Sequence, residues 1–159
     1  MKHRLISYII AAFFAVSFFP SVALQAAPYA AVVMDARNGK IYHSRNADTR
    51  LHPASLTKMM TLYVAFQAIE KNEISLDSYV TVSRNAAAEP PSKLWLKRGQ
   101  KIKLRYLIRA AAIKSANDAA TAIGEAISGT EAAFAKRMTR TARAMGMSRT
   151  TFKNAHGLT

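Results

Sequence analysis

Residues 53–58 read Pro-Ala-Ser-Leu-Thr-Lys, and the chain then continues to Glu70 without a glycine or a proline. Proline is common just ahead of a helix, so the sequence predicts a helix that begins at Ala54 or Ser55. Residues three apart on a helix share a side, which brings Ser55 and Lys58 within hydrogen-bonding reach. Apolar residues recur at spacings of three and four and predict a broad apolar face, made of Leu56, Met59, Met60, Tyr63 and Phe66.

Ser55 and Lys58 have the chemistry of a serine nucleophile and its base. Free backbone N–H groups and the positive end of the helix dipole stabilise negative charge that forms on the serine oxygen. A lysine acts as a base near neutral pH only when burial or a neighbouring cation lowers its pKa. We expect Met59, Met60 and another helix to supply that burial. In isolation, Ser-x-x-Lys is more typical of an ordinary helix cap followed by a solvated lysine.

A second motif, Ser-x-Asn, offers a hydroxyl that can pass a proton and an amide that can hold a carbonyl group. It occurs three times, at residues 44–46, 83–85 and 115–117. The first two belong to a predicted hairpin and to the start of a proline-rich loop, where these residue types form turns. The third separates two alanine-rich segments, so Ser115 and Asn117 can project into a cleft while the next residue, Asp118, caps the following helix.

The rest of the sequence predicts both strands and helices. Residues 30–35 and 40–44 are β-prone and are joined across Asn38-Gly39, a strong hairpin signal. A lone hairpin is marginal in water, so we expect the fold to need strands beyond those that this sequence supplies. The other predicted elements are a short strand at 79–83, a loop at 89–92 and about three helices within 104–145, broken near 115–118 and 128–129.

The composition excludes several classes of protein. The chain has 159 residues, with 23 Lys or Arg against 9 Asp or Glu and a formal net charge of +14. It has no cysteine, which excludes a disulfide scaffold, a zinc ribbon and a thiol nucleophile. Its four histidines are scattered without metal-ligand spacing. We therefore expect no metal ion and no other cofactor.

The first 26 residues predict a signal peptide. A charged start precedes an apolar run from Leu5 to Phe19, then a proline and several small residues. The run is shorter than the roughly 20 apolar residues that span a bilayer, and a retained N-terminal anchor is the alternative. In either case we expect residues 27–159 to be an exported domain in the periplasm or cell envelope. Removing Lys2 and Arg4 lowers its net charge from +14 to +12.

Several motifs, in order along the chain, resemble those of one family. Beside the hairpin and residues 53–58, they are Pro-Pro-Ser-Lys at 90–93, Ile-Lys-Ser-Ala-Asn-Asp-Ala-Ala at 113–120 and Asn-Ala-His-Gly-Leu at 154–158. The set is similar to the D-alanyl-D-alanine carboxypeptidase family of low-molecular-weight penicillin-binding proteins. The resemblance implies an α/β (α+β) fold of the β-lactamase/transpeptidase type, with a β-hairpin, a long helix bearing Ser-x-x-Lys and a helical subdomain. Residues 27–159 would be the N-terminal part of that catalytic domain, with the remaining sheet strands missing.

The resemblance also implies roles for four residues. Ser55 would be the acylated nucleophile, Lys58 its proton acceptor, Ser115 a proton relay to the leaving group and Asn117 a substrate-binding amide. The substrate would be a peptidoglycan stem peptide ending in D-Ala-D-Ala, with β-lactam antibiotics as inhibitors.

A third motif of that family, Lys-Thr-Gly, is absent from this sequence. In the family it binds the substrate carboxylate and supplies one of the two oxyanion-hole N–H groups; the other comes from Ser55 itself. Loss of one such donor alone costs roughly 10²- to 10³-fold in rate. We therefore expect little or no carboxypeptidase activity from this chain by itself.

Two other functions stay open. The stretch between Glu89 and Asp118 holds no acid, so the chain could be a non-catalytic basic module that binds an anionic membrane surface, or the charges could only form a solvated face. The expected export and the lack of a recognised binding motif argue against nucleic acid. A β-lactamase of class A would deacylate with a glutamate and a water, but no motif places Glu89 at Ser55. The basic residues are Lys93, Lys97, Arg98, Lys101, Lys103, Arg105 and Arg109, with Arg137, Arg140 and Arg143 on the last predicted helix.

Overall fold

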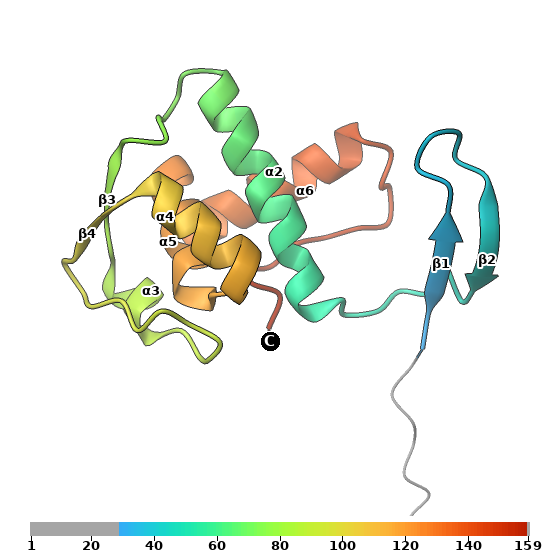
Figure 1. The fold of residues 1–159 in the computed structure, drawn as a ribbon, viewed down its shortest axis with the longest axis horizontal. Helices are drawn as coiled ribbons and strands as arrows, with labels where there is room; N and C mark the ends of the chain where they lie inside the picture. The colour runs from blue at the N-terminus through green and yellow to red at the C-terminus, as the bar shows by residue number, and fades with distance from the viewer. Residues whose placement is uncertain (1–28, 159) are drawn as a thin grey trace, which may run out of the picture. The chain divides into compact units, whose positions relative to one another are not determined.

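The computed structural model describes residues 29–158, which fall into two compact units (Figure 1). Residues 29–49 belong to the first unit and residues 50–158 to the second. The predicted signal peptide, residues 1–26, lies outside the described residues. Within the described range, no helix combines the length and the apolar character needed to cross a bilayer.

The first unit contains the predicted hairpin. Strands β1 (Ala31–Met34) and β2 (Ile41–Arg45) pair in antiparallel orientation. Asp35 fixes the turn, because its carboxylate accepts hydrogen bonds from the backbone N–H and the guanidinium of Arg37. Gly39 has a φ of +75°, a left-handed conformation that glycine adopts without strain. The large apolar side chains of both strands are at least half exposed, so the hairpin has no core of its own.

The second unit is mainly helical and contains a second two-stranded sheet. Its elements are the 3₁₀ helix η1 (Ala54–Leu56), α2 (Thr57–Glu70), β3 (Tyr79–Thr81), α3 (Arg84–Ala88), β4 (Lys101–Lys103), α4 (Leu104–Arg109), the π-helix η2 (Ala110–Lys114), α5 (Asn117–Ser128) and α6 (Glu131–Ala144). β3 and β4 pair in antiparallel orientation, with Val80 opposite Ile102. Helix α5 is central, because it contacts α2, α3, α4, α6 and β3.

Most of these elements match the predictions. The helix after Pro53 is confirmed, as are the strand that begins at Tyr79 and three helical segments within 104–145. The breaks between the segments, at residues 115–116 and 129–130, lie where the sequence indicates them. Helix α3 and strand β4 were not predicted; they are five and three residues long, too short to show a clear hydrophobic period.

Two groups of buried side chains form the core of this unit. One lies where α4 and α5 meet β3 and is centred on Leu104, Leu107 and Ile123. The other joins α2 to α6 through side chains that include Val64 and Phe134. Burial of a large apolar side chain stabilises a fold by about 1.5–3 kcal/mol, so these groups hold α2 and α5 in fixed positions. The start of α2 and the start of α5 carry the residues that the sequence selects.

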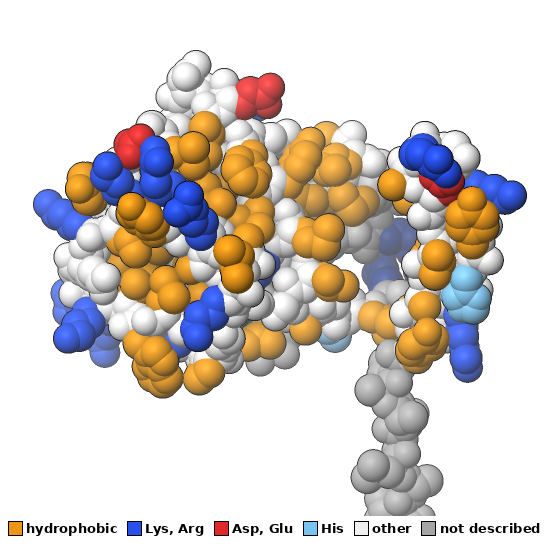
Figure 2. Space-filling model, viewed as in Figure 1, with side chains coloured by type: hydrophobic (Ala, Val, Ile, Leu, Met, Phe, Trp, Pro, Cys, Tyr) orange, Lys and Arg blue, Asp and Glu red, His pale blue; other side chains and the backbone are white. Residues whose placement is uncertain are grey.

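The apolar face of α2 lies largely in solvent. Leu56, Met59, Tyr63 and Phe66 are 42–70% exposed, and only Met60 of the predicted face is buried. The buried side of α2 consists instead of Thr57, Lys58, Met60, Thr61, Val64, Ala65 and Ala68. Small side chains on this side let α5 and α6 pack closely against the helix. Figure 2 shows hydrophobic side chains gathered over α2, which leaves an apolar face without a partner among residues 50–158.

Candidate active site

Ser55 sits in the tight turn that opens the long helix. Pro53 precedes η1, and Ala54 has a φ of +47°, which is unusual for a residue with a side chain. This backbone conformation starts the helical turn abruptly and leaves Ser55 exposed at its beginning. The hydroxyl therefore lies at the amino end of a helical segment, where backbone N–H groups and the helix dipole favour negative charge.

Lys58 lies one turn further on and is buried, with 3% of its surface exposed. Its Nζ is 3.4 Å from Ser55 Oγ and donates a hydrogen bond of 3.1 Å to the backbone carbonyl of His156. Burial lowers the pKa of Lys58, and the negative charge of Glu89 opposes that effect to a smaller extent. The structure thus brings the predicted nucleophile and base together, with the amine in an environment that favours its neutral form.

The environment that buries Lys58 differs in part from the expected one. Met60 is buried as expected, but Met59 is 70% exposed and points away from the core. The segment 154–158 provides the other cover, since its His156 carbonyl contacts the amine. Thr61, one turn beyond Lys58, donates a 2.6 Å hydrogen bond to the carbonyl of Ala155 in the same segment.

Gly157 lets this segment approach the Ser55 turn. It has a φ of +85°, and a Cβ at this position would lie 2.0 Å from the carbonyl oxygen of Ala54 and 2.5 Å from Thr57 Oγ1. No side chain fits at these distances, so the Asn-Ala-His-Gly-Leu motif packs directly on the Ser-x-x-Lys turn. In the sequence this motif contributes to the family resemblance, but nothing in it predicts a role at the site.

Ser115 and Asn117 lie at the junction between η2 and α5. Ser115 follows the π-helix in a left-handed conformation with a φ of +57° and is half-buried. Asn117 begins α5 and is only 2% exposed. Its side-chain Nδ2 donates to the carbonyl of Pro90 at 2.8 Å, and its backbone N–H donates to the carbonyl of Ser92 at 2.7 Å. Asn117 therefore holds the preceding loop in place.

Asp118 does not cap α5 in the predicted way. The N-cap position is Ala116, which offers no capping side chain, and Asp118 lies in the first turn of the helix. Its buried carboxylate accepts hydrogen bonds from the backbone N–H groups of Leu94 and Leu96. The residue thus fixes the loop that runs past the start of α5.

The two pairs of predicted residues lie on or beside elements that pack together, and they are not bonded to each other. The π-helix η2, which ends just before Ser115, packs against α2. Within residues 29–158, no hydrogen bond joins Ser115 or Asn117 to Ser55 or Lys58. The geometry therefore gives a bonded nucleophile and base, with a second polar pair at the junction between η2 and α5.

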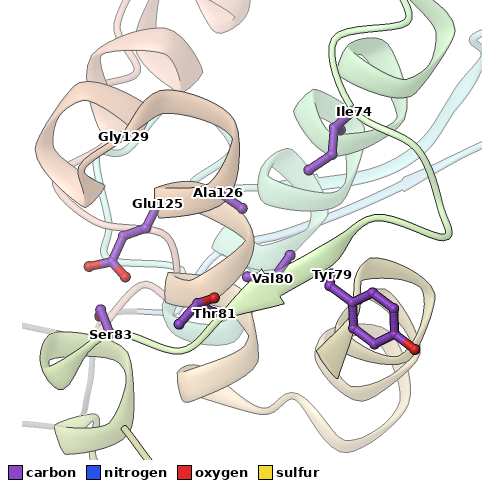
Figure 3. A pocket seen from close by; sticks show the side chains of 8 residues that line it. All are labelled: Ile74, Tyr79, Val80, Thr81, Ser83, Glu125, Ala126 and Gly129. Atoms are coloured by element: carbon purple, nitrogen blue, oxygen red, sulfur yellow. The ribbon is translucent and has the colours of Figure 1, made fainter. Parts of the chain in front are cut away.

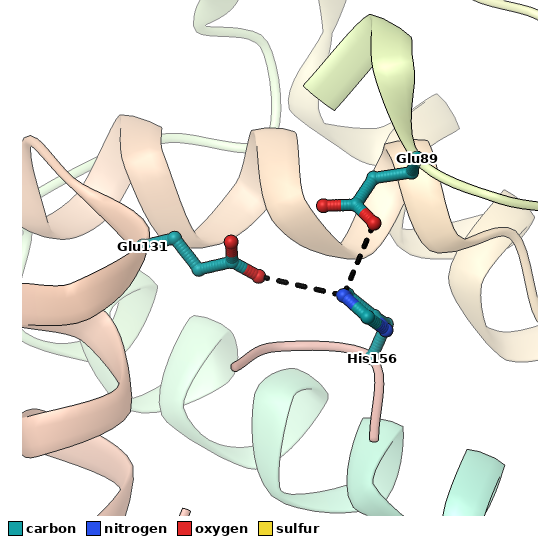
Figure 4. A group of neighbouring side chains, drawn as sticks. All are labelled: Glu89, Glu131 and His156. Carbon is teal, nitrogen blue, oxygen red and sulfur yellow. Dashed lines mark ion pairs between the residues drawn. The ribbon is translucent and has the colours of Figure 1, made fainter. Parts of the chain in front are cut away.

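Three residues near the site were not predicted from the sequence to belong to it. Glu89, Glu131 and His156 gather their side chains beside the 154–158 segment (Figure 4). Burial raises the pKa of the Glu89 carboxyl group. This carboxylate contacts Thr121 and His156 rather than Ser55, so its bonding gives no support to the role of a β-lactamase glutamate at the nucleophile.

A hollow of the described surface lies elsewhere. It runs between β3 and α5, with Ser83 and Glu125 at one end and Ile74 and Tyr79 at the other (Figure 3). None of the residues selected from the sequence lines it. The candidate site is consequently defined by the contacts of Lys58 and not by a cavity.

Comparison with known proteins places the chain in a family. A sequence profile for D-alanyl-D-alanine carboxypeptidase matches residues 18–159. The D-alanyl-D-alanine carboxypeptidase DacF of Bacillus subtilis is 37% identical over 129 residues, which are 81% of this chain and 33% of DacF. DacC of Escherichia coli is 37% identical over 133 residues, which are 80% of this chain and 33% of DacC. The chain thus spans about a third of the length of these curated relatives.

Solved structures show the same fold. The carboxypeptidase DacD of Francisella tularensis superposes with a TM-score of 0.78 and 37% identity, over 91% of this chain and 36% of that one. Penicillin-binding protein D2 of Listeria monocytogenes, solved in its ampicillin-bound form, gives a TM-score of 0.73 and 35% identity, over 88% of this chain and 55% of that one. The described residues are a partial, N-terminal portion of a mixed α/β fold of the penicillin-binding type. The chain belongs to the D-alanyl-D-alanine carboxypeptidase family.

Proposed function

We propose that this protein is a serine carboxypeptidase that removes the terminal D-alanine from peptidoglycan stem peptides. One observation carries the proposal: the buried amine of Lys58, whose pKa is lowered by burial, lies 3.4 Å from the hydroxyl of Ser55. A neutral amine at this distance can accept the hydroxyl proton as the serine oxygen attacks. The family membership supports the choice of D-Ala-D-Ala as the group attacked.

The reaction proceeds through an ester on Ser55. The serine oxygen adds to the carbonyl carbon of the penultimate D-alanine while Lys58 takes the hydroxyl proton, and the exposed N-terminal turn stabilises the oxyanion. The C–N bond then breaks, and the amine of the terminal D-alanine leaves with a proton that Lys58 gives up through the Ser115 hydroxyl. Water hydrolyses the ester in a second step, with the same base accepting its proton. No step requires a metal ion or a cofactor.

Ser115 and Asn117 act from the neighbouring helix. Ser115 directly follows η2, which packs on α2, and this neighbouring position supports its role as the proton relay. Asn117 is fixed by its bonds to the 90–92 loop. One amide N–H of its side chain is used by Pro90, which leaves the amide oxygen and the second N–H to hold the amide group of a substrate or a β-lactam.

Labelling with a fluorescent penicillin tests the proposal. We expect covalent label on Ser55, located by peptide mass spectrometry, and no label in Ser55→Ala. Lys58→Met should slow labelling about 10²- to 10⁴-fold, because the general base is lost. Ser44→Ala is the matched control: it removes an exposed serine of β2 from another Ser-x-Asn sequence and should leave labelling unchanged. Label that persists in Ser55→Ala would exclude Ser55 as the nucleophile.

The experiment compares two proteins. One is the chain itself, which contains no Lys-Thr-Gly sequence, and the other is a chimera that continues from residue 159 into the corresponding remainder of DacF. We expect weak labelling of the chain and stoichiometric labelling of the chimera, because the added part supplies the carboxylate-binding motif. Equal labelling of both would show that the added part is dispensable for acylation.

We also propose that the protein is exported and meets an anionic membrane surface. The predicted signal peptide and the basic stretch around β4 support this location. Exposed cations in that stretch include Lys97, Arg98 and Lys101. One acidic residue lowers the net charge of this basic stretch, however, because Asp77 forms ion pairs with both Lys103 and Arg105.

A further inference from the structure

A cluster of ionisable side chains lies next to the candidate base. His156 Nε2 is 3.1 Å from Glu89 Oε2 and 3.8 Å from Glu131 Oε1. Glu89 follows α3, Glu131 begins α6, and His156 belongs to the segment that covers Lys58, so the cluster joins three parts of the chain (Figure 4). Glu89 and His156 are both buried. Buried ionisable groups are retained at a cost in stability, which calls for a functional reason.

The bonding in this cluster is that of a hydrogen-bonded network and not of a metal site. Two carboxylates and an imidazole are suitable metal ligands. However, Nδ1 of His156 accepts a hydrogen bond of 3.1 Å from the backbone N–H of Leu158. An imidazole that accepts at Nδ1 carries its hydrogen on Nε2, and a nitrogen that carries hydrogen cannot bind a metal. The Nε2–H group therefore donates to the Glu89 carboxylate.

His156 connects the cluster to the base. Its imidazole is held by Glu89, and its backbone carbonyl accepts the 3.1 Å hydrogen bond from Lys58 Nζ. The residue before it is held as well, because the Ala155 N–H donates to Glu131 Oε1 at 3.1 Å. The position of the carbonyl that orients the Lys58 amine is thus set from two carboxylates on other elements.

Glu89 also acts on Lys58 through its charge. Burial lowers the pKa of Lys58, whereas the negative charge of Glu89 raises it. The titratable groups that face Glu89 are His156, Glu131 and Glu125, and burial raises the pKa of Glu89 itself. Its other carboxylate oxygen accepts a 2.9 Å hydrogen bond from the Thr121 hydroxyl. A carboxylate fixed in this way holds its charge, when ionised, at a fixed position in the site.

We propose that Glu89 is a positioning residue for Lys58: it holds the His156 imidazole so that the His156 carbonyl meets the amine, and its charge sets how readily the amine loses its proton. This inference rests on the proposed role of Lys58 as the base. It adds to that proposal a residue that regulates the base without touching the substrate.

A titration of Lys58 followed by NMR tests the inference without any need for catalysis. The full chain is prepared with ¹³Cε-labelled lysine, and Lys58→Met identifies the signal of Lys58. Glu89→Gln removes the charge but keeps an oxygen that can accept from His156 Nε2–H and an amide that can donate to Thr121 Oγ1. In Glu89→Gln we expect the Lys58 signal to titrate with a midpoint at lower pH than in the unaltered chain, because the charge that favours the ammonium form is gone.

Glu73→Gln is the matched control. Glu73 is also a carboxylate in an ion pair, but its partner is Arg137 and it does not act on Lys58. Its replacement should leave the Lys58 midpoint unchanged. An unchanged midpoint in Glu89→Gln, or an equal shift in Glu73→Gln, would overturn the inference.

The unaltered chain provides a second measurement that does not depend on the folding of a variant. With ¹³Cδ-labelled glutamate in addition, the Lys58 signal should show an extra inflection at the pH where Glu89 titrates. A Lys58 curve with a single step would overturn the inference. Penicillin labelling of Ser55 is scored separately, so its failure would count against the proposed carboxypeptidase activity and not against the coupling between Glu89 and Lys58.

Discussion

Burial of Lys58 makes the stability of the second unit depend on pH. Its pKa is lowered in the folded chain and returns to about 10.5 on unfolding. Between these two values the unfolded chain binds more protons than the folded one, so the free energy of unfolding rises with pH. The contribution is most unfavourable below the folded pKa and disappears above about 10.5.

Lys58→Met removes this dependence. We expect the free energy of unfolding of the unaltered chain, relative to that of the variant, to increase as the pH rises toward about 10.5. Urea denaturation followed by circular dichroism measures both proteins at each pH. Other titrating groups, including Glu89, are common to both proteins and largely cancel in the difference. A difference that stays constant over this range would show that the amine is not desolvated.

Gly157 is the residue on which the contact between segment 154–158 and the Ser55 turn depends. Alanine there adopts the strained left-handed conformation and also meets the Ala54 carbonyl and Thr57 Oγ1. Gly146 has the same φ of +85° but open space around it, which makes Gly146→Ala the matched control. We expect the control to lose about 1–2 kcal/mol and Gly157→Ala to lose at least about 1 kcal/mol more.

The two glycine variants are compared by urea denaturation and by penicillin labelling of the chimera. Gly157→Ala should also slow labelling of Ser55, because the displaced segment carries the His156 carbonyl that orients Lys58. Equal losses of stability in both variants would mean that the 154–158 segment moves aside without strain.

Among the elements, strand β4 and the loop before it decide whether the basic stretch binds membranes. Within the described residues Lys97 and Arg98 are exposed and form no ion pair, whereas Lys103 and Arg105 are paired with Asp77. Each cation near an anionic bilayer contributes about 1 kcal/mol. We expect Lys97→Gln with Arg98→Gln to weaken binding to phosphatidylserine vesicles about 30-fold, and Lys103→Gln with Arg105→Gln to weaken it much less.

Co-sedimentation with the vesicles at low and at high salt measures this binding. Binding that depends on the basic stretch weakens as salt is added, because exposed charges are screened. If the unaltered chain fails to bind at low salt, the charges form only a solvated face. Equal losses in the two double variants would show that the ion pairs with Asp77 have no effect.

The elements that the sequence predicts well are those with strong local signals. The start of α2 follows from Pro53, the hairpin from Asn38-Gly39, and the break before α5 from Ser115 to Asn117. Strand β4 is missed because the alternation of Lys101, Ile102 and Lys103 is too short to stand out from a charged loop. Such a strand forms only because β3 pairs with it, and the local sequence does not show a pairing between separate segments.

The candidate site likewise has a part that the local sequence predicts and a part that it does not. The approach of Lys58 to Ser55 follows from a spacing of three residues on a helical turn and is visible in the sequence. The contacts of Lys58 with His156, and of His156 with Glu89, join segments far apart in the chain. No local period or motif specifies such pairs, so the sequence gives Glu89 no contact with Lys58 or His156. The exposure of the apolar side of α2 also depends on what packs against it.

At the scale of the whole molecule, the distribution of apolar surface is unusual for a soluble chain. The exposed face of α2, formed by Leu56, Met59, Tyr63 and Phe66, is one contiguous stripe at helical spacing. Stripes of this kind mark surfaces that another element or partner covers. The chain spans about a third of its curated relatives, and the hairpin also exposes its apolar side chains.

This distribution predicts that the chain binds hydrophobic dyes and self-associates through α2. Phe66→Ser should lower the fluorescence of bound 8-anilinonaphthalene-1-sulfonate and the weight-average mass, while changing the free energy of unfolding by no more than about 0.5 kcal/mol, because Phe66 is 53% exposed. Val64→Ser is the control on the opposite side of the same helix, where the side chain is fully buried. It should cost about 2 kcal/mol and leave dye binding by the folded chain unchanged. Dye fluorescence, analytical ultracentrifugation and urea denaturation separate the two effects; a large loss of stability in Phe66→Ser would show that this face of α2 is covered within the chain itself.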